Sequence, residues 1–144
     1  MAYNHLKAMD ILKKELQKNF KKLTFDYESD KDCSKATARG VTLGKLDDDV
    51  LLMFDLRKNG RVTFRVVFDK IDESPATLAL VNKFNRENLY FCCFIRSDGF
   101  LEFANSTIYS KEKEVSGHAT FFMNRFLDLI DEDTVKALSA CTHA

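Results

Sequence analysis

The chain has 144 residues, the usual size of one domain with a single core. Hydrophobic residues make up 45% and charged residues 31%, values that exclude a disordered chain and a membrane-embedded one. Twenty-two lysines and arginines balance 22 aspartates and glutamates, so no overall charge attracts the protein to nucleic acid or to an anionic membrane. We therefore expect one domain over residues 1–144 that binds neither.

The start of the chain and its cysteines favour a cytoplasmic protein. The first ten residues, MAYNHLKAMD, lack the apolar core of a secretory signal. No apolar run approaches the ~20 residues that span a bilayer. The cysteines show no CxxC spacing, and free thiols are expected for them in a reducing compartment. They are Cys33, Cys92, Cys93 and Cys141.

The first predicted element is a helix. Apolar residues recur at spacings of three and four from Leu6 to Leu23, which is typical of an amphipathic helix, and Asn4 is the expected N-cap. Residues 26–35, DYESDKDCSK, are predicted to form a polar loop. Residues 36–46, ATARGVTLGKL, are at best a weak strand because they contain two glycines.

Residues 50–69, VLLMFDLRKNGRVTFRVVFD, predict a β-hairpin with one apolar face. A two-residue turn would pair Phe54 with Arg65 and mix apolar with charged side chains. A three-residue turn at 58–60 instead pairs Phe54 with Phe64, and it requires a left-handed backbone at Gly60. The same register extends to Leu56 with Val62 and to Leu52 with Val66, and it leaves Arg61, Thr63 and Arg65 on the wet face.

Ser74 followed by Pro75 predicts the start of a second helix, which should end near Asn88. Its expected buried stripe is Leu78, Val81 and Phe84. The segment LYFCCFIR, residues 89–96, is then predicted to be a strand. A three-residue turn at 97–99 would pair Ile95 with Leu101 and Cys93 with Phe103.

A last helix is expected to begin near Ser116, with a break at DEDT before a short final turn. Its expected buried residues are Ala119, Phe122, Phe126 and Ile130. The predicted order is helix, three strands, helix, two strands, helix. Tight turns make the sheet mainly antiparallel, and the helices should pack on one of its faces, which gives an α+β domain.

This order, with LVNKFNREN running into a strand and then SDGFLEF, resembles the YbjN-like family. Its members share the fold of type III secretion chaperones, also called CesT-like or Tir-chaperone-like. Asn82 and Asn85 match the VNxxN of the second helix, and Asp98 and Gly99 match the second turn. The resemblance lies mainly in residues 50–109. It implies a loose association with regulation, and its chaperone relatives are homodimers that hold an unfolded stretch of a partner.

The sequence gives little support for an enzyme. Cys92 or Cys93 could act as a nucleophile with His118 as its base, but a catalytic thiolate needs an electropositive, partly exposed setting, and the neighbours here are aromatic. His118 is expected at the surface, in the first turn of the last helix. The run Asp47, Asp48 and Asp49 lacks a calcium-loop pattern and is expected to be a solvated turn. No catalytic residue, metal or cofactor is predicted.

Two sets of residues are candidates for binding. Asn82 and Asn85 share a helical face and could bind a ligand through their amides, although bonds to nearby backbone are the more common use of such asparagines. If residues 89–96 form a strand, one of its faces would be apolar and uncovered in an open sheet, as a partner-binding or dimer surface would be. That set is Tyr90, Cys92, Phe94 and Phe100.

The sequence therefore favours a non-catalytic, cytoplasmic protein-binding module, chaperone- or adaptor-like, that acts as a homodimer and binds a partner polypeptide; the resemblance adds a regulatory role. Two alternatives stay open. A small-molecule sensor would need an enclosed pocket with convergent polar groups. A thiol enzyme would need a hydrogen bond between Cys92 or Cys93 and a histidine.

Overall fold

The fold is α+β, with helices packed on an antiparallel sheet. The structure, a computed structural model, describes residues 3–44 and 49–142. Its elements are α1 (His5–Asn19), β1 (Asp26–Ser29), β2 (Cys33–Thr42), β3 (Asp49–Arg57), β4 (Arg61–Lys70), α2 (Pro75–Glu87), β5 (Cys92–Ile95), β6 (Phe100–Ile108), the 3-10 helix η1 (Glu112–Val115), α3 (His118–Leu129) and α4 (Asp133–Cys141). Within the described residues, six strands form one sheet in the order β1-β2-β3-β4-β6-β5.

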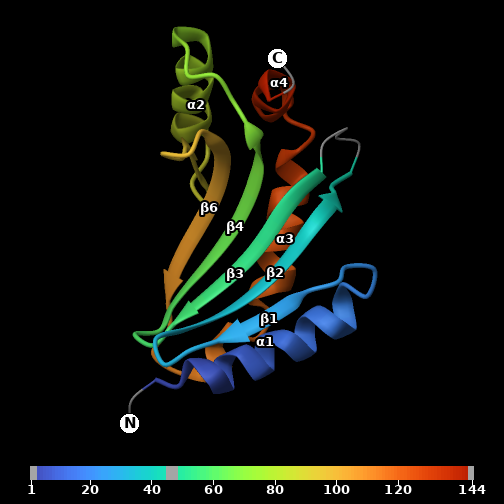
Figure 1. Cartoon of the computed structure of the whole chain (residues 1–144), viewed down its shortest axis with the longest axis vertical. Coiled ribbons are helices and arrows are strands. Elements are labelled where there is room, and N and C mark those ends of the chain that lie inside the picture. The colour runs from blue at the N-terminus through green and yellow to red at the C-terminus, as the bar shows by residue number, and fades with distance from the viewer. Residues whose placement is uncertain (1–2, 45–48, 143–144) are drawn as a thin grey trace.

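The helices are spread along the length of the sheet (Figure 1). Figure 1 shows α1 at one end, next to β1, and α2 and α4 at the other end, with α3 running behind the strands between them. A cluster of phenylalanines joins α2 and α3 to the sheet: the rings of Phe84 and Phe103 lie 4.9 Å apart, and those of Phe103 and Phe126 lie 5.3 Å apart. The core therefore lies on one side of the sheet, and the other side carries none of these helices.

The predicted loop over residues 26–35 was wrong, and with it the exact order of elements. Residues 26–29 form β1, which pairs with β2 through a turn in which the Asp30 carboxylate accepts the backbone N–H groups of Asp32 and Cys33. An edge strand buries little, so it needs no apolar alternation, and its charges suggested a loop. Strand β2 begins at Cys33, inside the predicted loop, and contains a bulge between Ala38 and Val41.

Both hairpin registers were predicted correctly. Phe54 pairs with Phe64, and Cys93 pairs with Phe103. The turn glycines Gly60 and Gly99 have φ of 91° and 90°, the left-handed conformation that a three-residue turn requires.

The helix caps were also predicted correctly, but one buried position was not. The side chain of Asn4 accepts two backbone N–H groups at the start of α1, and Ser74 forms a capping box with Thr77 at the start of α2. Leu78 is exposed, whereas Val81 and Phe84 are buried. Thr77 is buried instead, and its hydroxyl bonds the carbonyl groups of Asp72 and Ser74, which precede the helix.

The last helix begins at His118, after Gly117, and its expected buried residues are all buried. The predicted break at DEDT is present, but the segment after it is a full helix, α4, rather than a single turn. Asp49 begins β3, whereas Asp47 and Asp48 lie outside the described residues. That leaves the predicted acidic turn only partly described.

Candidate functional site

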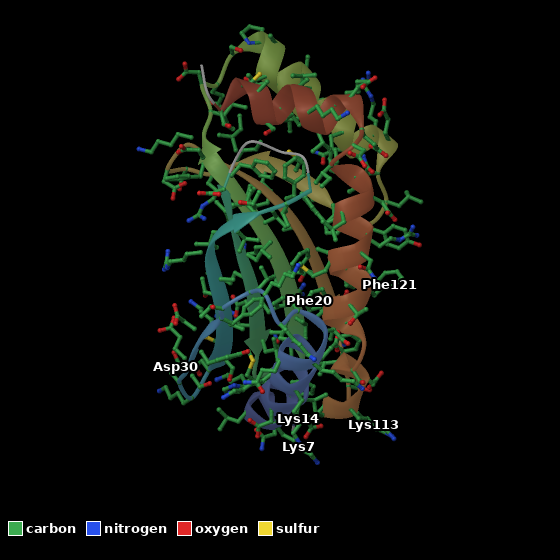
Figure 2. All side chains as sticks on the ribbon, turned by 90° about the vertical axis from the view of Figure 1, so that its right-hand side faces the viewer. Lys7, Lys14, Phe20, Asp30, Lys113 and Phe121 are labelled. Carbon is green, nitrogen blue, oxygen red and sulfur yellow. The ribbon has the colours of Figure 1, made fainter. Side chains whose placement is uncertain are left out.

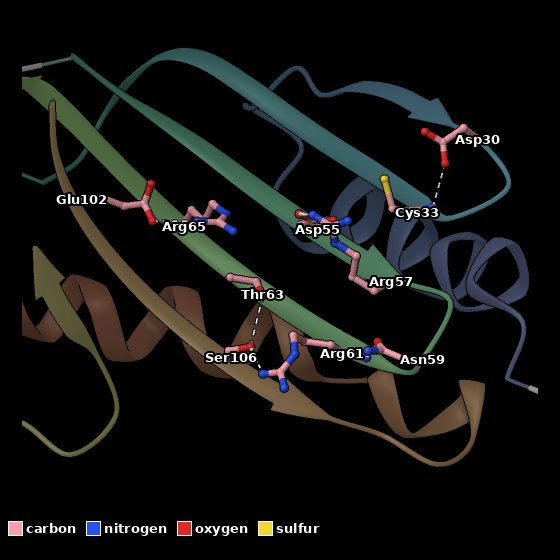
Figure 3. Close-up of polar contacts among 10 residues, drawn as sticks. All are labelled: Asp30, Cys33, Asp55, Arg57, Asn59, Arg61, Thr63, Arg65, Glu102 and Ser106. Atoms are coloured by element: carbon pink, nitrogen blue, oxygen red, sulfur yellow. Dashed lines mark hydrogen bonds and ion pairs between the residues drawn. The ribbon is translucent and has the colours of Figure 1, made fainter. Parts of the chain in front are cut away.

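The side of the sheet away from the helices, called the open face below, is polar at its centre. Figure 3 looks onto this face, with the helices behind the strands. Thr63 lies opposite Asp55, and Arg61 donates a hydrogen bond of 2.9 Å to the hydroxyl of Ser106. Arg61, Thr63 and Arg65 therefore lie on the predicted face, but that face is not wet throughout, because Thr63 is buried.

Two carboxylates on the open face are almost fully buried. Glu102 is 1% exposed and forms ion pairs with Arg65 at 2.8 Å and Arg96 at 3.6 Å. Asp55 is 4% exposed, its Oδ2 lies 3.5 Å from Arg57, and its Oδ1 has no hydrogen-bond partner among the described residues. The centre of this face is thus a set of paired charges rather than an apolar surface.

The four residues predicted for a binding surface are divided by the structure. Cys92 and Phe94 lie in β5, opposite Ala104 and Glu102 on the open face, and Cys92 is exposed while Phe94 is half-buried. Phe100, at the start of β6, is half-buried, with the ammonium of Lys70 5.6 Å from its ring centre. Cys92, Phe94 and Phe100 therefore lie together at the β5–β6 margin of the open face.

Tyr90 lies apart from that margin because β5 begins at Cys92, later than the sequence predicted. Its ring packs edge-on against Phe121 of α3, with centroids 6.0 Å apart, and the guanidinium of Arg125 lies 4.4 Å from its ring centre. Tyr90 thus belongs to a surface on α3.

The two candidate asparagines of α2 differ sharply. Asn85 bonds the backbone of β5: its Nδ2 donates to the carbonyl of Cys93 at 2.9 Å, and its Oδ1 accepts the N–H of Cys93 at 2.7 Å. Asn82 is exposed on the same helix. Asn85 therefore fixes structure, which was the more common use expected of it.

The residues of the thiol hypothesis are not arranged as a nucleophile and its base. Burial raises the pKa of the Cys93 thiol to about 12, so it is protonated at neutral pH. His118 is buried, contrary to the sequence prediction, and burial lowers its pKa to about 4. Its Nδ1 lies 2.8 Å from the hydroxyl of Tyr109, and its ring packs on Phe122. The His118 ring also lies 6.2 Å from that of Phe54 in β3, so it is part of the core, and its hydrogen-bond partner is a tyrosine.

An exposed apolar surface lies where α2 leads into β5. Leu89 is 96% exposed, Tyr90 45% and Phe121 46%, and we call these three residues the Leu89 surface. Figure 2 shows Phe121 projecting outward from α3. Of the six large apolar side chains that are exposed within the described residues, these three are close together.

Two hollows border the Leu89 surface. One, of about 300 Å³, is lined by Glu87, Asn88, Leu89, Tyr90, Phe91, Arg125, Asp128, Leu129 and Glu132. The other, of about 430 Å³, lies toward the open face and is lined by Asn85, Asn88, Leu89, Tyr90, Phe91, Cys92, Ala104, Asn105 and Ser106. The amide of Asn105 donates a hydrogen bond of 2.7 Å to the carbonyl of Tyr90, which fixes the backbone between the two hollows.

Sequence reasoning missed Leu89 and Phe121. A signal for Phe121 was present, because Phe121 and Phe122 are neighbours on a helix and point about 100° apart, so one face of α3 cannot bury both. Leu89 was assigned to a strand. Leu89 is exposed because it lies in the connection before β5, and no sequence pattern marks where that connection ends.

No family model, curated protein or solved structure matches this chain. Among residues 3–44 and 49–142, no helix is long and apolar enough to cross a membrane. The same residues contain no group of three or more histidine, cysteine, aspartate or glutamate side chains that could hold a metal ion. What the protein does must therefore be inferred from its surfaces.

Proposed function

We propose that the chain is a non-catalytic protein-binding module of the cytoplasm, chaperone- or adaptor-like, that acts as a homodimer and holds a partner polypeptide. The observation that carries this proposal is the Leu89 surface, where Leu89 and Tyr90 line two hollows and Phe121 packs against Tyr90, all three exposed. Aromatic and leucine side chains that are exposed together are typical of surfaces that bind protein, because covering them removes a large apolar area from water.

The alternatives have less support. A thiol enzyme would have to use Cys92, because the Cys93 thiol is buried and protonated, and His118 is bonded to Tyr109. A small-molecule sensor would need an enclosed cavity, whereas the side chains of the Leu89 surface project from the protein.

We place the homodimer contact on the β5–β6 margin of the open face, at Cys92, Phe94 and Phe100. The edge of β5 is less suitable, because Asn85 already bonds both backbone groups of Cys93 and so prevents a second strand from pairing there. Beside the margin lie arginines and Glu102, and a two-fold interface can bring such a mixed surface against itself with opposite charges in contact. This arrangement leaves the Leu89 surface to the partner polypeptide.

Sedimentation velocity at micromolar concentration tests the dimer. We expect the wild type to sediment as a dimer and Phe94→Asp as a folded, weaker associator, because the interface would bury an unpaired carboxylate. Leu6→Asp is the matched control, since it replaces an exposed leucine on α1, at the other end of the molecule. A monomeric wild type, or equal weakening by both substitutions, would contradict the proposed dimer.

A further inference from the structure

The hollow of about 300 Å³ beside the Leu89 surface has an apolar floor and an acidic rim. Phe91 is buried at its base, and Leu129, on α3, is half-buried. Glu87, Asp128 and Glu132 line it and are exposed. They come from the end of α2, the end of α3 and the α3–α4 connection, so three separate segments contribute carboxylates to one small surface.

The carboxylates of this rim are free to bind a cation. Within residues 3–44 and 49–142, none of Glu87, Asp128 and Glu132 has an ion-pair partner. The cation in the hollow, Arg125, lies over the rings of Tyr90 and Phe121, at 4.4 and 5.6 Å. Among the described residues that line the hollow, three negative charges thus face one positive charge that stacks on aromatic rings, and the hollow favours a positively charged occupant.

The exposed apolar side chains beside the rim indicate that the occupant also has apolar groups to cover them. Leu89 projects almost fully into water beside the rim, and half of the Tyr90 surface is also uncovered. A polyamine or a metal ion would neutralise the carboxylates and leave these side chains wet. A segment with apolar residues on one face and lysines or arginines beside them would cover both.

We infer that this hollow and the Leu89 surface bind a basic, amphipathic segment of the partner protein. The inference rests on the proposed protein-binding function and names the chemistry of the partner. The negative rim repels acidic segments and nucleic acid, so specificity comes from charge while the apolar contacts supply area.

A pair of synthetic peptides tests the inference. The first, of about 14 residues or four helical turns, carries leucines at spacings of three and four and lysines elsewhere; the second has glutamate in place of every lysine. Fluorescence anisotropy with labelled peptide measures affinity for the full chain. We expect the basic peptide to bind, its affinity to fall as salt is added, and the acidic peptide not to bind.

Substitutions then locate the site. The triple variant Glu87→Gln/Asp128→Asn/Glu132→Gln should weaken binding of the basic peptide about tenfold, through the loss of three modest charge contacts. The control, Asp10→Asn/Glu28→Gln/Asp69→Asn, changes the net charge equally at exposed carboxylates elsewhere and should bind as the wild type does. Leu89→Ser should weaken binding, whereas Leu6→Ser should not. Circular dichroism confirms that each variant is folded.

The outcomes separate the inference from the proposed function. Equal affinity for both peptides, or equal weakening by the two triple variants, overturns the inference, because binding would then be non-specific or governed by net charge. If the wild type is a dimer that Phe94→Asp weakens and yet neither peptide binds, the inference fails while the proposed dimer stands. If the wild type is a monomer and neither peptide binds, both fail.

Discussion

The side chain of Asn85 holds both backbone hydrogen-bonding groups of Cys93, at 2.9 Å to the carbonyl oxygen and 2.7 Å from the N–H. One amide thus pairs with the outer edge of β5 as a neighbouring strand would. It ties α2 to the sheet and at the same time closes an edge that could otherwise pair with another chain.

Replacing Asn85 with alanine should therefore have two effects. Two backbone groups lose their partners, and we expect a loss of about 1–3 kcal/mol in the free energy of unfolding. The freed β5 edge should also increase self-association at high concentration. Asn82→Ala, an exposed position on the same helix, should change neither. Urea titration and light scattering measure the two effects, and equal behaviour of the two variants would contradict the role given to Asn85.

The two hairpin glycines offer a second matched pair. A Cβ at Gly60 would overlap the carbonyl oxygen of Tyr109, whereas the nearest atom to a Cβ at Gly99 is the flexible Lys70 side chain, 3.9 Å away. Both positions have a positive φ, which costs alanine roughly 1 kcal/mol. We expect Gly99→Ala to lose about that amount and Gly60→Ala to lose clearly more. Thermal unfolding measures the difference, and equal losses would argue against the close packing of this turn.

A carboxylate on α1 caps the first turn of α3. Glu15 accepts the backbone N–H groups of Gly117 and Thr120 at 2.7 and 2.6 Å, and the Thr120 hydroxyl at 2.8 Å. Since an N-cap is worth about 1 kcal/mol and this one also joins two helices, Glu15→Ala should lower stability by about 1–3 kcal/mol. Asp10→Ala, at an exposed carboxylate on the same helix, is the control. Chemical denaturation of the two variants tests this, and similar small losses would contradict it.

The buried His118 should make stability depend on pH. Its pKa falls from 6.5 in the unfolded chain to about 4 in the fold, so the unfolded state binds the extra proton between these values. Stability is therefore highest above pH 6.5 and decreases as the pH falls toward 4, by roughly 3 kcal/mol from this group. The free energy of unfolding, measured by urea titration from pH 7 to 4.5, should show most of that loss.

A double variant isolates the contribution of His118. Tyr109→Phe/His118→Phe removes the imidazole together with the hydroxyl that bonds it. Its free energy of unfolding should depend much less on pH in this window. Hydrogen bonds lower the pKa values of the Asp30 and Glu114 carboxyls, so these groups change the free energy of unfolding only in more acidic solution. An unchanged pH dependence in the double variant would show that His118 is not buried in neutral form.

The elements that the sequence predicted well are those whose local chemistry is strong. Alternating apolar residues and turn glycines determined both registers, and Asn4 and Ser74 capped their helices as expected. The first strand was missed because an edge strand of acidic residues has neither apolar alternation nor β-branched side chains.

The candidate site was predicted less well than the fold. The sequence pointed to the face of β5, but it could not show that β5 begins only at Cys92, which leaves Tyr90 to pack on α3. It also placed His118 at the surface, because a histidine in a first turn has no local signal for burial. The hollow beside Leu89 is formed by the end of α2, the connection from α2 to β5, the end of α3 and the connection from α3 to α4. Only the tertiary structure brings these segments together.

Cys92 offers the most direct measurement of the proposed dimer, because this exposed thiol lies on the β5–β6 margin. With iodoacetamide in large excess, we expect its alkylation rate, read by mass spectrometry, to fall several-fold as the protein is raised from sub-micromolar to tens of micromolar. The rate at the half-buried Cys141 of α4 should stay constant. In Phe94→Asp, which associates more weakly, the Cys92 rate should fall much less over the same range of concentration. A Cys92 rate that is the same at every concentration in the wild type would contradict the dimer contact on which the proposed function rests.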